Sequence, residues 1–297
     1  MDLKAYLAEK RALVDEALKG VFPSPGGPAA DVVKAMTYSL FAGGKRLRPI
    51  LCIAGAEAVG GEGRTVLPVA CALELVHTYS LIHDDLPVMD NDDLRRGKPT
   101  SHKVFGEAVA LLAGDGLLTE AFRLMSGAGG PEAPSDPRAL LRVIGLVGEA
   151  AGYGGMVGGQ VVDIQWEGKQ ADADILEFIH THKTGALIAA SVTAGAVLAG
   201  GRDDEVGAIT RYGRNIGHAF QVADDILDVE GDSTKLGKGV GGDARKKKVT
   251  YPSVLGLGPS KELQKALVGK ALDALQRFDE KAEPLRAMAV YIIERKK

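Results

Sequence analysis

The sequence has few of the features that mark specialised classes of protein. Its 297 residues include two cysteines, one tryptophan and 5% aromatic residues, and the formal net charge is −3. Two cysteines cannot build a disulfide framework, and Cys52 and Cys71 both lie in apolar stretches, as expected for buried thiols in a reducing compartment. Because there is no basic surplus, general nucleic-acid binding has no support. A chain of this length can bury a large core without covalent staples.

Long apolar runs are also missing. The first twenty residues, MDLKAYLAEKRALVDEALKG, carry charges throughout and have the pattern of an amphipathic helix rather than a signal peptide. The longest low-charge run, residues 186–200, is too short and too rich in small residues for a membrane span. We therefore expect a cytoplasmic protein without a membrane span, in which this run is a buried helix.

Strand signals are scarce, whereas helical periodicity is widespread. We expect helices over residues 70–85, 108–125, 139–152, 173–200 and 204–229. Breaks are expected at 127–137, 200–204 and 230–248, and none is long or polar enough to require a domain linker. The pattern predicts one all-α domain over residues 1–297 with many helices.

A first aspartate cluster lies in LIHDDLPVMDNDDLRRGK, residues 81–98. Asp84 and Asp85 come at the end of an apolar helical stretch, and Pro87 is expected to end that helix near Leu86. The chain could then turn so that Asp90 points back toward the pair.

A second cluster lies in HAFQVADDILDV and contains Asp224, Asp225 and Asp228. Asp224 and Asp228 are four residues apart, which places both carboxylates on one helix face about 6 Å apart along the axis. Like charges at that spacing repel unless a cation lies between them. Carboxylate oxygens without nearby cysteine suit Mg²⁺, which shares its coordination with substrate phosphates. Either cluster alone could be acidic loop surface, but two clusters on apolar helices favour several ions and a strongly anionic ligand.

A bound diphosphate would also require cations near the aspartates. Two glycines in FAGGKRLRP allow close backbone approach to a ligand, and arginine forks suit phosphate oxygens. Each basic residue could instead be ordinary surface, and the sequence cannot choose among residues 246–248. The candidates are Lys45, Arg46, Arg48, Arg95, Arg96, Lys183, Lys238 and Lys248.

Several other stretches resemble known functional motifs but do not match them. GDSTKLGKG has the wrong glycine spacing for a P-loop, and Gly239 stands where Ser or Thr would hold magnesium. GYGGMVGGQ lacks the G-x-G-x-x-G spacing, and His77 and His83 are six residues apart, which does not suit a zinc pair on one helix face. There is no Ser-His-Asp signature either, so a reaction without a protein nucleophile fits better.

These motifs together resemble those of the trans-isoprenyl diphosphate synthases. The resemblance rests on DDLPVMD with RRGKPTSHK, and on GGKRLRP, GGQVVD, HKTG, FQVADDILD and the terminal YIIERKK. It runs from about residue 30 to the C-terminus and is closest to the bacterial farnesyl diphosphate synthases, also called geranyltranstransferases. It implies an all-α, homodimeric isoprenoid-synthase fold with a central active-site cavity, and a polyprenyl synthetase domain.

The resemblance also implies roles for individual residues. Mg²⁺, with three ions per active site, would be held by Asp84, Asp85, Asp90 and Asp224, supported by Asp225 and Asp228. The allylic diphosphate or its developing charge would be contacted by Arg95, Lys183, Gln221, Lys238 and Lys248. Isopentenyl diphosphate would be bound by Lys45, Arg48, His77 and Arg96. Gln160, Asp163 and Thr184 would line the region between the two substrates. Catalysis itself would involve Asp84, Asp85, Lys183, Thr184, Gln221 and Asp224.

The implied reaction joins isopentenyl diphosphate head-to-tail to dimethylallyl and geranyl diphosphate. The allylic diphosphate ionises, the alkene attacks the cation, and a proton is lost. Ser80 and Tyr79 precede Asp84 by four and five residues, so a bulky Tyr79 could form the floor that stops elongation at (E,E)-farnesyl diphosphate, C15. Tyr79 could also be a packed core aromatic while another residue sets the length. Continuation to geranylgeranyl diphosphate, C20, is the alternative.

Two other classes share parts of this pattern. A class I terpene cyclase would normally lack both the second D-D-x-x-D motif and GGKRLRP, and this chain has both. A silent partner subunit of a heteromeric synthase has no need to keep its aspartates, and here every one is present. Both alternatives are therefore disfavoured.

Overall fold

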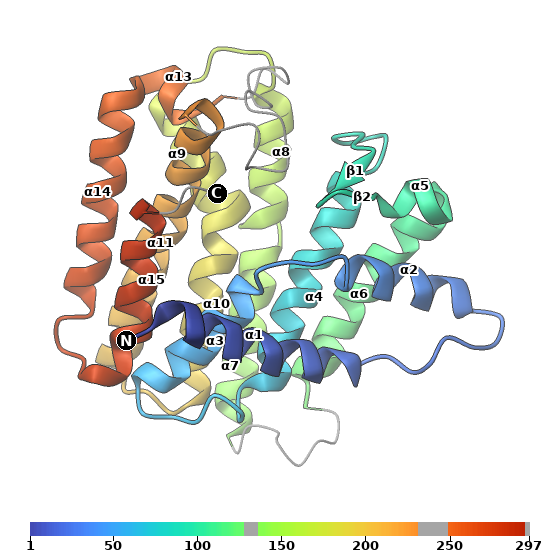
Figure 1. The fold of residues 1–297 in the computed structure, drawn as a ribbon, viewed down its shortest axis with the longest axis horizontal. Helices are drawn as coiled ribbons and strands as arrows, with labels where there is room; N and C mark the ends of the chain where they lie inside the picture. The colour runs from blue at the N-terminus through green and yellow to red at the C-terminus, as the bar shows by residue number, and fades with distance from the viewer. Residues whose placement is uncertain (128–135, 231–248, 295–297) are drawn as a thin grey trace.

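A computed structural model describes residues 1–127, 136–230 and 249–294 of the chain, and in these ranges the fold is almost entirely helical (Figure 1). Two-residue strands β1 (Leu94–Arg95) and β2 (Lys98–Pro99) form a small antiparallel hairpin. The expected all-α class is therefore confirmed.

The helices follow one another with short connections. They are α1 (Leu3–Lys19), α2 (Ala30–Leu40), α3 (Leu47–Ala58), α4 (Leu67–Asp84), α5 (Ser101–Phe105), α6 (Glu107–Met125), α7 (Pro137–Ala151), α8 (Met156–Trp166), α9 (Ala173–Ile179), α10 (Ala186–Leu198), α11 (Asp203–Glu230), α13 (Tyr251–Leu255), α14 (Leu257–Ala274) and α15 (Glu283–Glu294). A π-helix, η1 (His180–Gly185), joins α9 to α10, and a 3₁₀ turn, η2 (Glu280–Ala282), precedes α15.

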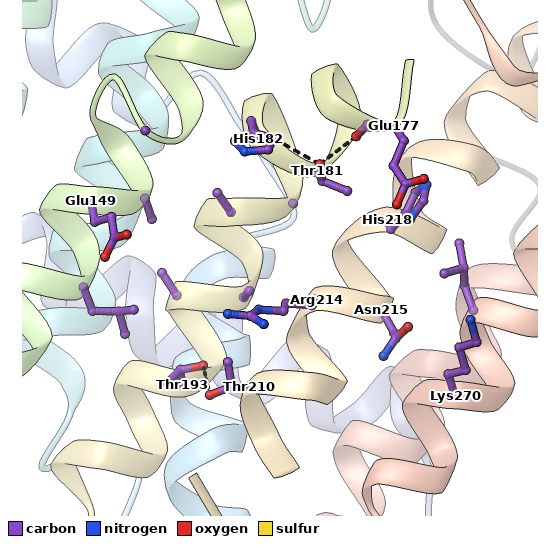
Figure 2. Close-up of a pocket in the computed structure, with 18 residues that line it drawn as sticks. Glu149, Glu177, Thr181, His182, Thr193, Thr210, Arg214, Asn215, His218 and Lys270 are labelled. Carbon is purple, nitrogen blue, oxygen red and sulfur yellow. Dashed lines mark hydrogen bonds between the residues drawn. The ribbon is translucent and has the colours of Figure 1, made fainter. Parts of the chain in front are cut away.

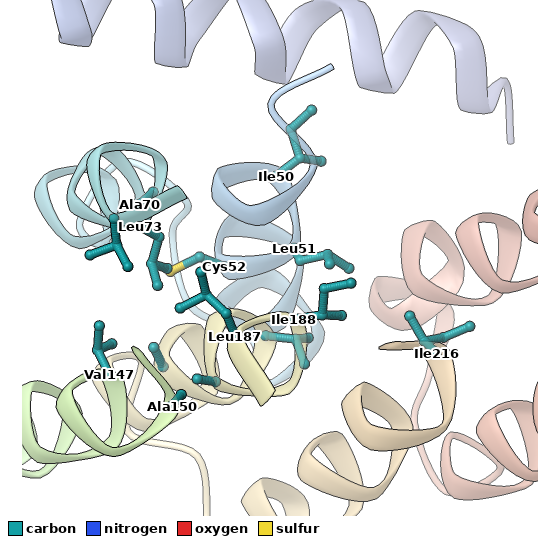
Figure 3. Packing of buried hydrophobic residues seen from close by; sticks show 14 of the residues in the cluster. Ile50, Leu51, Cys52, Ala70, Leu73, Val147, Ala150, Leu187, Ile188 and Ile216 are labelled. Carbon is teal, nitrogen blue, oxygen red and sulfur yellow. The ribbon is translucent and has the colours of Figure 1, made fainter. Parts of the chain in front are cut away.

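Helix α10 lies at the centre of the core. It packs against α3, α7 and α11, and its residues from Leu187 to Val197 are all buried. This confirms that the low-charge run at 186–200 forms a buried helix. Leu187 lies beside Cys52 of α3, and Ile188 lies beside Leu51, in the apolar cluster (Figure 3). A helix apolar on all sides is stable only when neighbours cover every face, as they do here.

The contact between α3 and α10 depends on glycine. A Cβ added at Gly55 would lie 2.1 Å from the carbonyl oxygen of Val192, and one at Gly195 would lie 1.8 Å from that of Cys52. Because these contacts involve backbone atoms, a side chain could not be accommodated by a rotamer change. The two backbones touch directly, so small residues at the crossing set the distance between the helices.

Most expected helices are confirmed to within a few residues. The exception is the stretch 173–200, which the sequence predicts as one helix and the structure divides into α9, η1 and α10. The wide π turn carries two close contacts: Gly159 of α8 lies against Lys183, and Gly217 of α11 lies against Gly185. Apolar periodicity does not distinguish a single π turn from α-helix, which is why the division was not foreseen.

Residues Pro137–Trp166 have the length and composition of a membrane-crossing helix, with a mean hydropathy of 1.3 and 33% of the window buried. In the structure this stretch consists of two helices, α7 and α8, with Gly152 in extended backbone between them. Composition alone does not separate a core helix from a span, and this stretch differs from the longest low-charge run, residues 186–200.

Both cysteines are buried and neither is in a disulfide. Burial raises the pKa of the Cys52 thiol well above its usual range, and it raises the pKa of the Cys71 thiol, beside Glu74, to about 12. Thiols with such high pKa values are protonated and unreactive at neutral pH. Their predicted role as buried thiols is therefore confirmed.

The glycine contact in the core gives the first testable prediction. Gly195→Ala should lower the free energy of unfolding by about 3 kcal/mol, because the new methyl group overlaps the Cys52 carbonyl. Urea unfolding at one fixed protein concentration measures this. The matched control is Gly145→Ala in α7, where an added Cβ meets nothing within 4 Å. That variant should gain about 0.5–1 kcal/mol from helix propensity. Equal effects at both positions would contradict the close approach of α3 and α10.

Candidate functional site

The two aspartate motifs lie at the same end of the helical bundle. Asp84 is the last residue of α4, and the second motif occupies the last two turns of α11. Both helices end near the same pole of the molecule, where β1 and α13 also lie (Figure 1). The fold therefore brings to one end two motifs separated by 140 residues in the sequence.

The first motif continues from the end of α4 into a tight turn. The backbone N–H of Asp90 donates to the carbonyl of Asp84 at 2.9 Å, and that of Asn91 donates to Leu86 at 3.1 Å. Asn91 has φ 51°, a left-handed conformation that Asn tolerates well. The turn that the sequence predicted after Leu86 is thus confirmed, and it holds the backbone of Asp90 against the end of the helix.

Asp85 is engaged by an arginine. Nε of Arg95 lies 2.8 Å from both carboxylate oxygens, and Nη2 lies 2.7 Å from Oδ1. Burial disfavours the charged form of Arg95, but the bonds to Asp85 outweigh it and raise the pKa of Arg95. Because the Asp85 side chain is 5% exposed, this pair fixes the β1–β2 hairpin to the end of α4.

A cationic group lies beside the first motif and consists of Arg48, His77 and Arg96. Burial, and then the nearby Arg96, lower the pKa of Arg48 to about 10, although Glu74 opposes the shift. Burial, followed by Arg48 and Arg96, holds the pKa of His77 well below its usual range. Nε of Arg48 is buried without a hydrogen-bond partner among the described residues. Two crowded arginines beside a neutral histidine fit an anionic ligand.

Arg46, the middle basic residue of GGKRLRP, points into the protein instead. Its Nη1 lies 2.8 Å from Oε1 of Glu74, its Nε 2.8 Å from Oδ1 of Asp15, and its Nη2 donates to the Leu40 carbonyl at 2.8 Å. Arg46 is 4% exposed, so it does not face a ligand as the sequence analysis allowed. The neglected signal was Glu74, a carboxylate within the apolar helix ACALELVH that needed a buried partner.

The two glycines before Lys45 make room for an arginine. Gly44 has φ +141°, and a Cβ there would lie 2.7 Å from Nη1 of Arg96. The same guanidinium donates to the carbonyl of Gly43. The predicted close approach at this turn therefore involves the side chain of Arg96, which it places beside Lys45 and Arg48.

On the other side of the site, α8 and η1 lie in direct contact. Nζ of Lys183 lies 2.5 Å from Oδ2 of Asp163, and Oε1 of Gln160 is buried without a hydrogen-bond partner among the described residues. Thr184 is partly buried in η1, and Gln221 is partly buried four residues before Asp225. The structure thus brings Gln160, Asp163 and Lys183 together at the contact between α8 and η1.

Asp225 is held by two residues that were not among the predicted site residues. Its Oδ2 accepts the backbone N–H of Tyr251 at 2.8 Å and lies 3.6 Å from Nε2 of His180. Asp225 and His180 are each 5% exposed. The available signals were the histidine in HTHKTG and the tyrosine in TYPS, since polar residues in apolar surroundings usually have partners.

The carboxylates fit magnesium chemically, although they do not form a closed cage. In the part of the chain that the structure describes, no three His, Cys, Asp or Glu side chains form a group that could hold a metal ion. Asp84, Asp90, Asp224 and Asp228 are partly buried. Such dispersed hard oxygens suit Mg²⁺, which retains waters and completes its shell with phosphate oxygens.

Tyr79 lies on α4, five residues before Asp84, and is 7% exposed. Its ring meets that of His83 edge-on, with centroids 5.7 Å apart, and burial together with Asp84 raises the pKa of Tyr79 to about 12. Ser80 donates to the His77 carbonyl at 2.9 Å. Tyr79 is therefore a fixed, bulky group close to the aspartates.

A cavity of about 520 Å³ lies between α7, η1, α10, α11 and α14 (Figure 2). Its lining includes Glu177, Arg214, His218 and Lys270, and none of the predicted site residues. A smaller cavity, of about 30 Å³, adjoins Asp85 and Arg95. Lys238 and Lys248, which were predicted to contact the allylic diphosphate, lie outside the described residues.

Comparison with known proteins identifies the class. The polyprenyl synthetase family model matches residues 30–289, so the chain belongs to this family. It is 50% identical, over 99% of its length and 80% of the relative, to the chloroplastic heterodimeric geranylgeranyl pyrophosphate synthase large subunit 1 of Arabidopsis thaliana. It is 47% identical, over 99% of its length and 97% of the relative, to the farnesyl diphosphate synthase of Geobacillus stearothermophilus.

The fold agrees with this assignment. The structure of an FPP/GFPP synthase from Zymomonas mobilis matches with a TM-score of 0.88 and 38% sequence identity, covering 98% of this chain and 99% of that one. The family and isoprenoid-synthase fold implied by the sequence motifs are therefore confirmed. The chain is a short-chain trans-prenyltransferase.

The crowding of the cationic group can be tested by titration. NMR should show that His77 stays neutral at pH 6, and Arg48→Gln should raise its pKa toward 6.5, because a neighbouring positive charge is removed. Because the pKa of folded His77 lies below the unfolded value, His77 contributes stability above about pH 6.5 that is lost as the pH falls. The control variant, Arg214→Gln on the wall of the 520 Å³ cavity, should leave the pKa of His77 unchanged. An unaltered His77 titration in Arg48→Gln would contradict the proximity of the two groups.

Proposed function

We propose that the protein condenses isopentenyl diphosphate with dimethylallyl and geranyl diphosphate, head-to-tail, to form (E,E)-farnesyl diphosphate. The observation that carries this proposal is the pairing of two kinds of anion site at one end of the bundle. Two aspartate motifs at the ends of α4 and α11 suit a metal-bound diphosphate, and the Arg48, His77 and Arg96 group suits a second diphosphate without metal.

The allylic diphosphate is assigned to the aspartate side. Asp84, Asp90, Asp224 and Asp228 would hold Mg²⁺, for which the family resemblance gives three ions per site. When bound, Mg²⁺ acts as a Lewis acid that stabilises charge on the departing pyrophosphate. Asp85 was predicted as a further ligand, but both its oxygens bind Arg95 here, so we assign it to positioning that arginine. Asp225 supports the second motif.

The basic side chains then have distinct tasks. Arg95 and Lys183 provide fixed positive charge beside the allylic diphosphate, where charge develops on ionisation. Gln221 and Thr184 line the same side, and Lys238 and Lys248 are assigned there from the sequence alone. Lys183 is oriented by its contact with Asp163, next to Gln160, so its position is set before the substrate binds.

Isopentenyl diphosphate is assigned to the cationic side. Lys45, Arg48 and Arg96 would pair with its phosphate oxygens, and neutral His77 can hydrogen-bond to them without adding charge. The alkene attacks the allylic cation, a carbon–carbon bond forms, and the proton lost from the condensed product passes to the departing pyrophosphate. No protein nucleophile is needed.

The C15 product is the preferred outcome because Tyr79 is bulky, buried and fixed close to Asp84. The relatives do not decide the length, since one is named a geranylgeranyl synthase and the other a farnesyl synthase at similar identity. C20 therefore remains the alternative product, and Ser80, on nearly the same face as Asp84, is the other residue assigned to chain length.

We also propose a homodimer and a cytoplasmic location. Large apolar side chains are exposed on neighbouring helices α6, α7 and α8, namely Leu111, Leu112, Leu141, Val157, Val161 and Ile164. Exposed apolar side chains on three neighbouring helices are suited to contact with a second copy of the chain. The cytoplasmic location rests on the buried thiols, which suit a reducing compartment.

The reaction itself is tested by a panel of primers. Purified protein with Mg²⁺ and isopentenyl diphosphate should convert dimethylallyl and geranyl diphosphate to farnesyl diphosphate and leave farnesyl diphosphate unextended. Chromatography of the dephosphorylated alcohols measures this, and chelation with EDTA should abolish it. Conversion of a single allylic diphosphate without isopentenyl diphosphate would favour a terpene cyclase. No condensation with any primer would favour a silent subunit.

The role of Tyr79 is tested by paired substitutions. Tyr79→Ser should shift the main product from C15 to C20 or longer, because removal of the ring opens space along α4 beyond the aspartates. Tyr79→Phe keeps the ring and loses only the hydroxyl, so its products should remain C15. If both variants still stop at C15, another residue sets the product length.

A further inference from the structure

Tyr251 makes two contacts with the same face of α11. Its backbone N–H donates to Oδ2 of Asp225 at 2.8 Å, and its hydroxyl lies 2.5 Å from Nε2 of His218. His218 and Asp225 are seven residues apart, which is about two turns of helix on one face. Tyr251 therefore lies along two turns of α11, with its backbone at one end and its hydroxyl at the other.

His180 packs against both Tyr251 and Asp225. Its ring meets the Tyr251 ring edge-on, with centroids 5.1 Å apart at 89°, and its Nε2 lies 3.6 Å from the Asp225 carboxylate. Burial, and then the nearby His218, lower the pKa of His180 to about 3. The buried His180 ring thus packs against both Tyr251 and Asp225 and limits their movement.

The three side chains connect elements that carry the proposed active site. His180 begins η1, which also carries Lys183, and His218 and Asp225 belong to α11. Gly185 and Gly217 allow the two helices to touch nearby. Any displacement of Tyr251 would therefore loosen the end of α11 relative to η1.

We propose that Tyr251, together with His218 and His180, is a positioning residue for the second aspartate motif. By holding Asp225, it fixes the rotation of the last turns of α11 and thus the direction in which Asp224 and Asp228 present their carboxylates. The inference rests on the proposed function, in which those carboxylates hold Mg²⁺ and diphosphate. Tyr251 itself touches neither substrate nor metal in this role.

Ordinary core packing is the competing explanation, and α11 offers a matched control. Tyr212 lies on the same helix, is fully buried, and donates its hydroxyl to the Leu285 carbonyl at 2.7 Å. It resembles Tyr251 in chemistry and burial but has no contact with the second motif. A packing role predicts that the two hydroxyls matter alike, whereas a positioning role predicts a difference upon ligand binding.

The test compares Tyr251→Phe with Tyr212→Phe in thermal unfolding of the full chain. Each variant should lower the Tm of the ligand-free protein by a few degrees, since each loses one buried hydrogen bond. Mg²⁺ with inorganic pyrophosphate should raise the Tm of wild type and Tyr212→Phe equally. Tyr251→Phe should need about fivefold more Mg²⁺ and pyrophosphate for the same rise, because one positioning hydrogen bond is lost.

Variants of His218 extend the test to the network. His218→Leu should weaken the ligand-induced rise as Tyr251→Phe does, and the double variant should be no worse than either, because the two residues act through one bond. His218→Gln keeps a hydrogen-bonding group and should recover part of the response.

The outcomes separate this inference from the proposed function. An equal ligand response in Tyr251→Phe and Tyr212→Phe would overturn the positioning role while leaving the enzyme assignment intact. Fully additive effects of Tyr251→Phe and His218→Leu would also overturn it. No response of the wild type to Mg²⁺ and pyrophosphate would instead overturn the proposed metal-diphosphate site, and this inference with it.

Discussion

The buried guanidinium of Arg46 is the contact on which the cationic half of the site depends. It joins Asp15 of α1, Glu74 of α4 and the carbonyl of Leu40 at the end of α2. Removing one partner from such a pair leaves an uncompensated buried charge, at a cost of about 3–5 kcal/mol. Arg46 also caps the start of α3 with φ 52°, so its pairing fixes both the turn and the first turn of the helix that carries Arg48.

With that turn fixed, the guanidinium groups of Arg48 and Arg96 are held close to each other and to His77. Burial lowers the pKa values of Arg48 and His77, and neighbouring arginines add to both shifts: Arg96 acts on Arg48, and Arg48 and Arg96 act on His77. At the first aspartate motif, by contrast, the negative charge of Asp85 is neutralised by the positive charge of Arg95. The first motif and the cationic group are therefore both set in place by the protein, which in the proposed reaction would limit the reorganisation needed as charge develops on the leaving pyrophosphate.

The helices could be predicted because their apolar residues recur with the helical period, and the aspartate motifs could be found from spacing alone. Which basic residue faces inward could not be predicted in this way. Lys45, Arg46 and Arg48 are equivalent by position in the motif, and Arg46 is distinguished by distant partners such as Glu74, 28 residues away. The π turn at η1 was also not predicted, because apolar periodicity does not distinguish it from α-helix, and its contact with Gly217 of α11 is made across more than 30 residues of sequence. Long-range partners, rather than local pattern, decide such features.

The proposed control of product length also depends on long-range partners, here those of Tyr79. Tyr79 can act as a floor only if it is held rigid, and its ring rests on His83, whose Nε2 lies 3.0 Å from the Leu111 carbonyl of α6. His83 fits there because α6 has Gly114 at the contact, where a Cβ would lie 2.1 Å from the ring. The proposed floor would thus depend on the α4–α6 contact. If Tyr79 sets the product length, a change in this contact would alter the product even with the tyrosine kept, so the presence of Tyr79 alone does not fix the length.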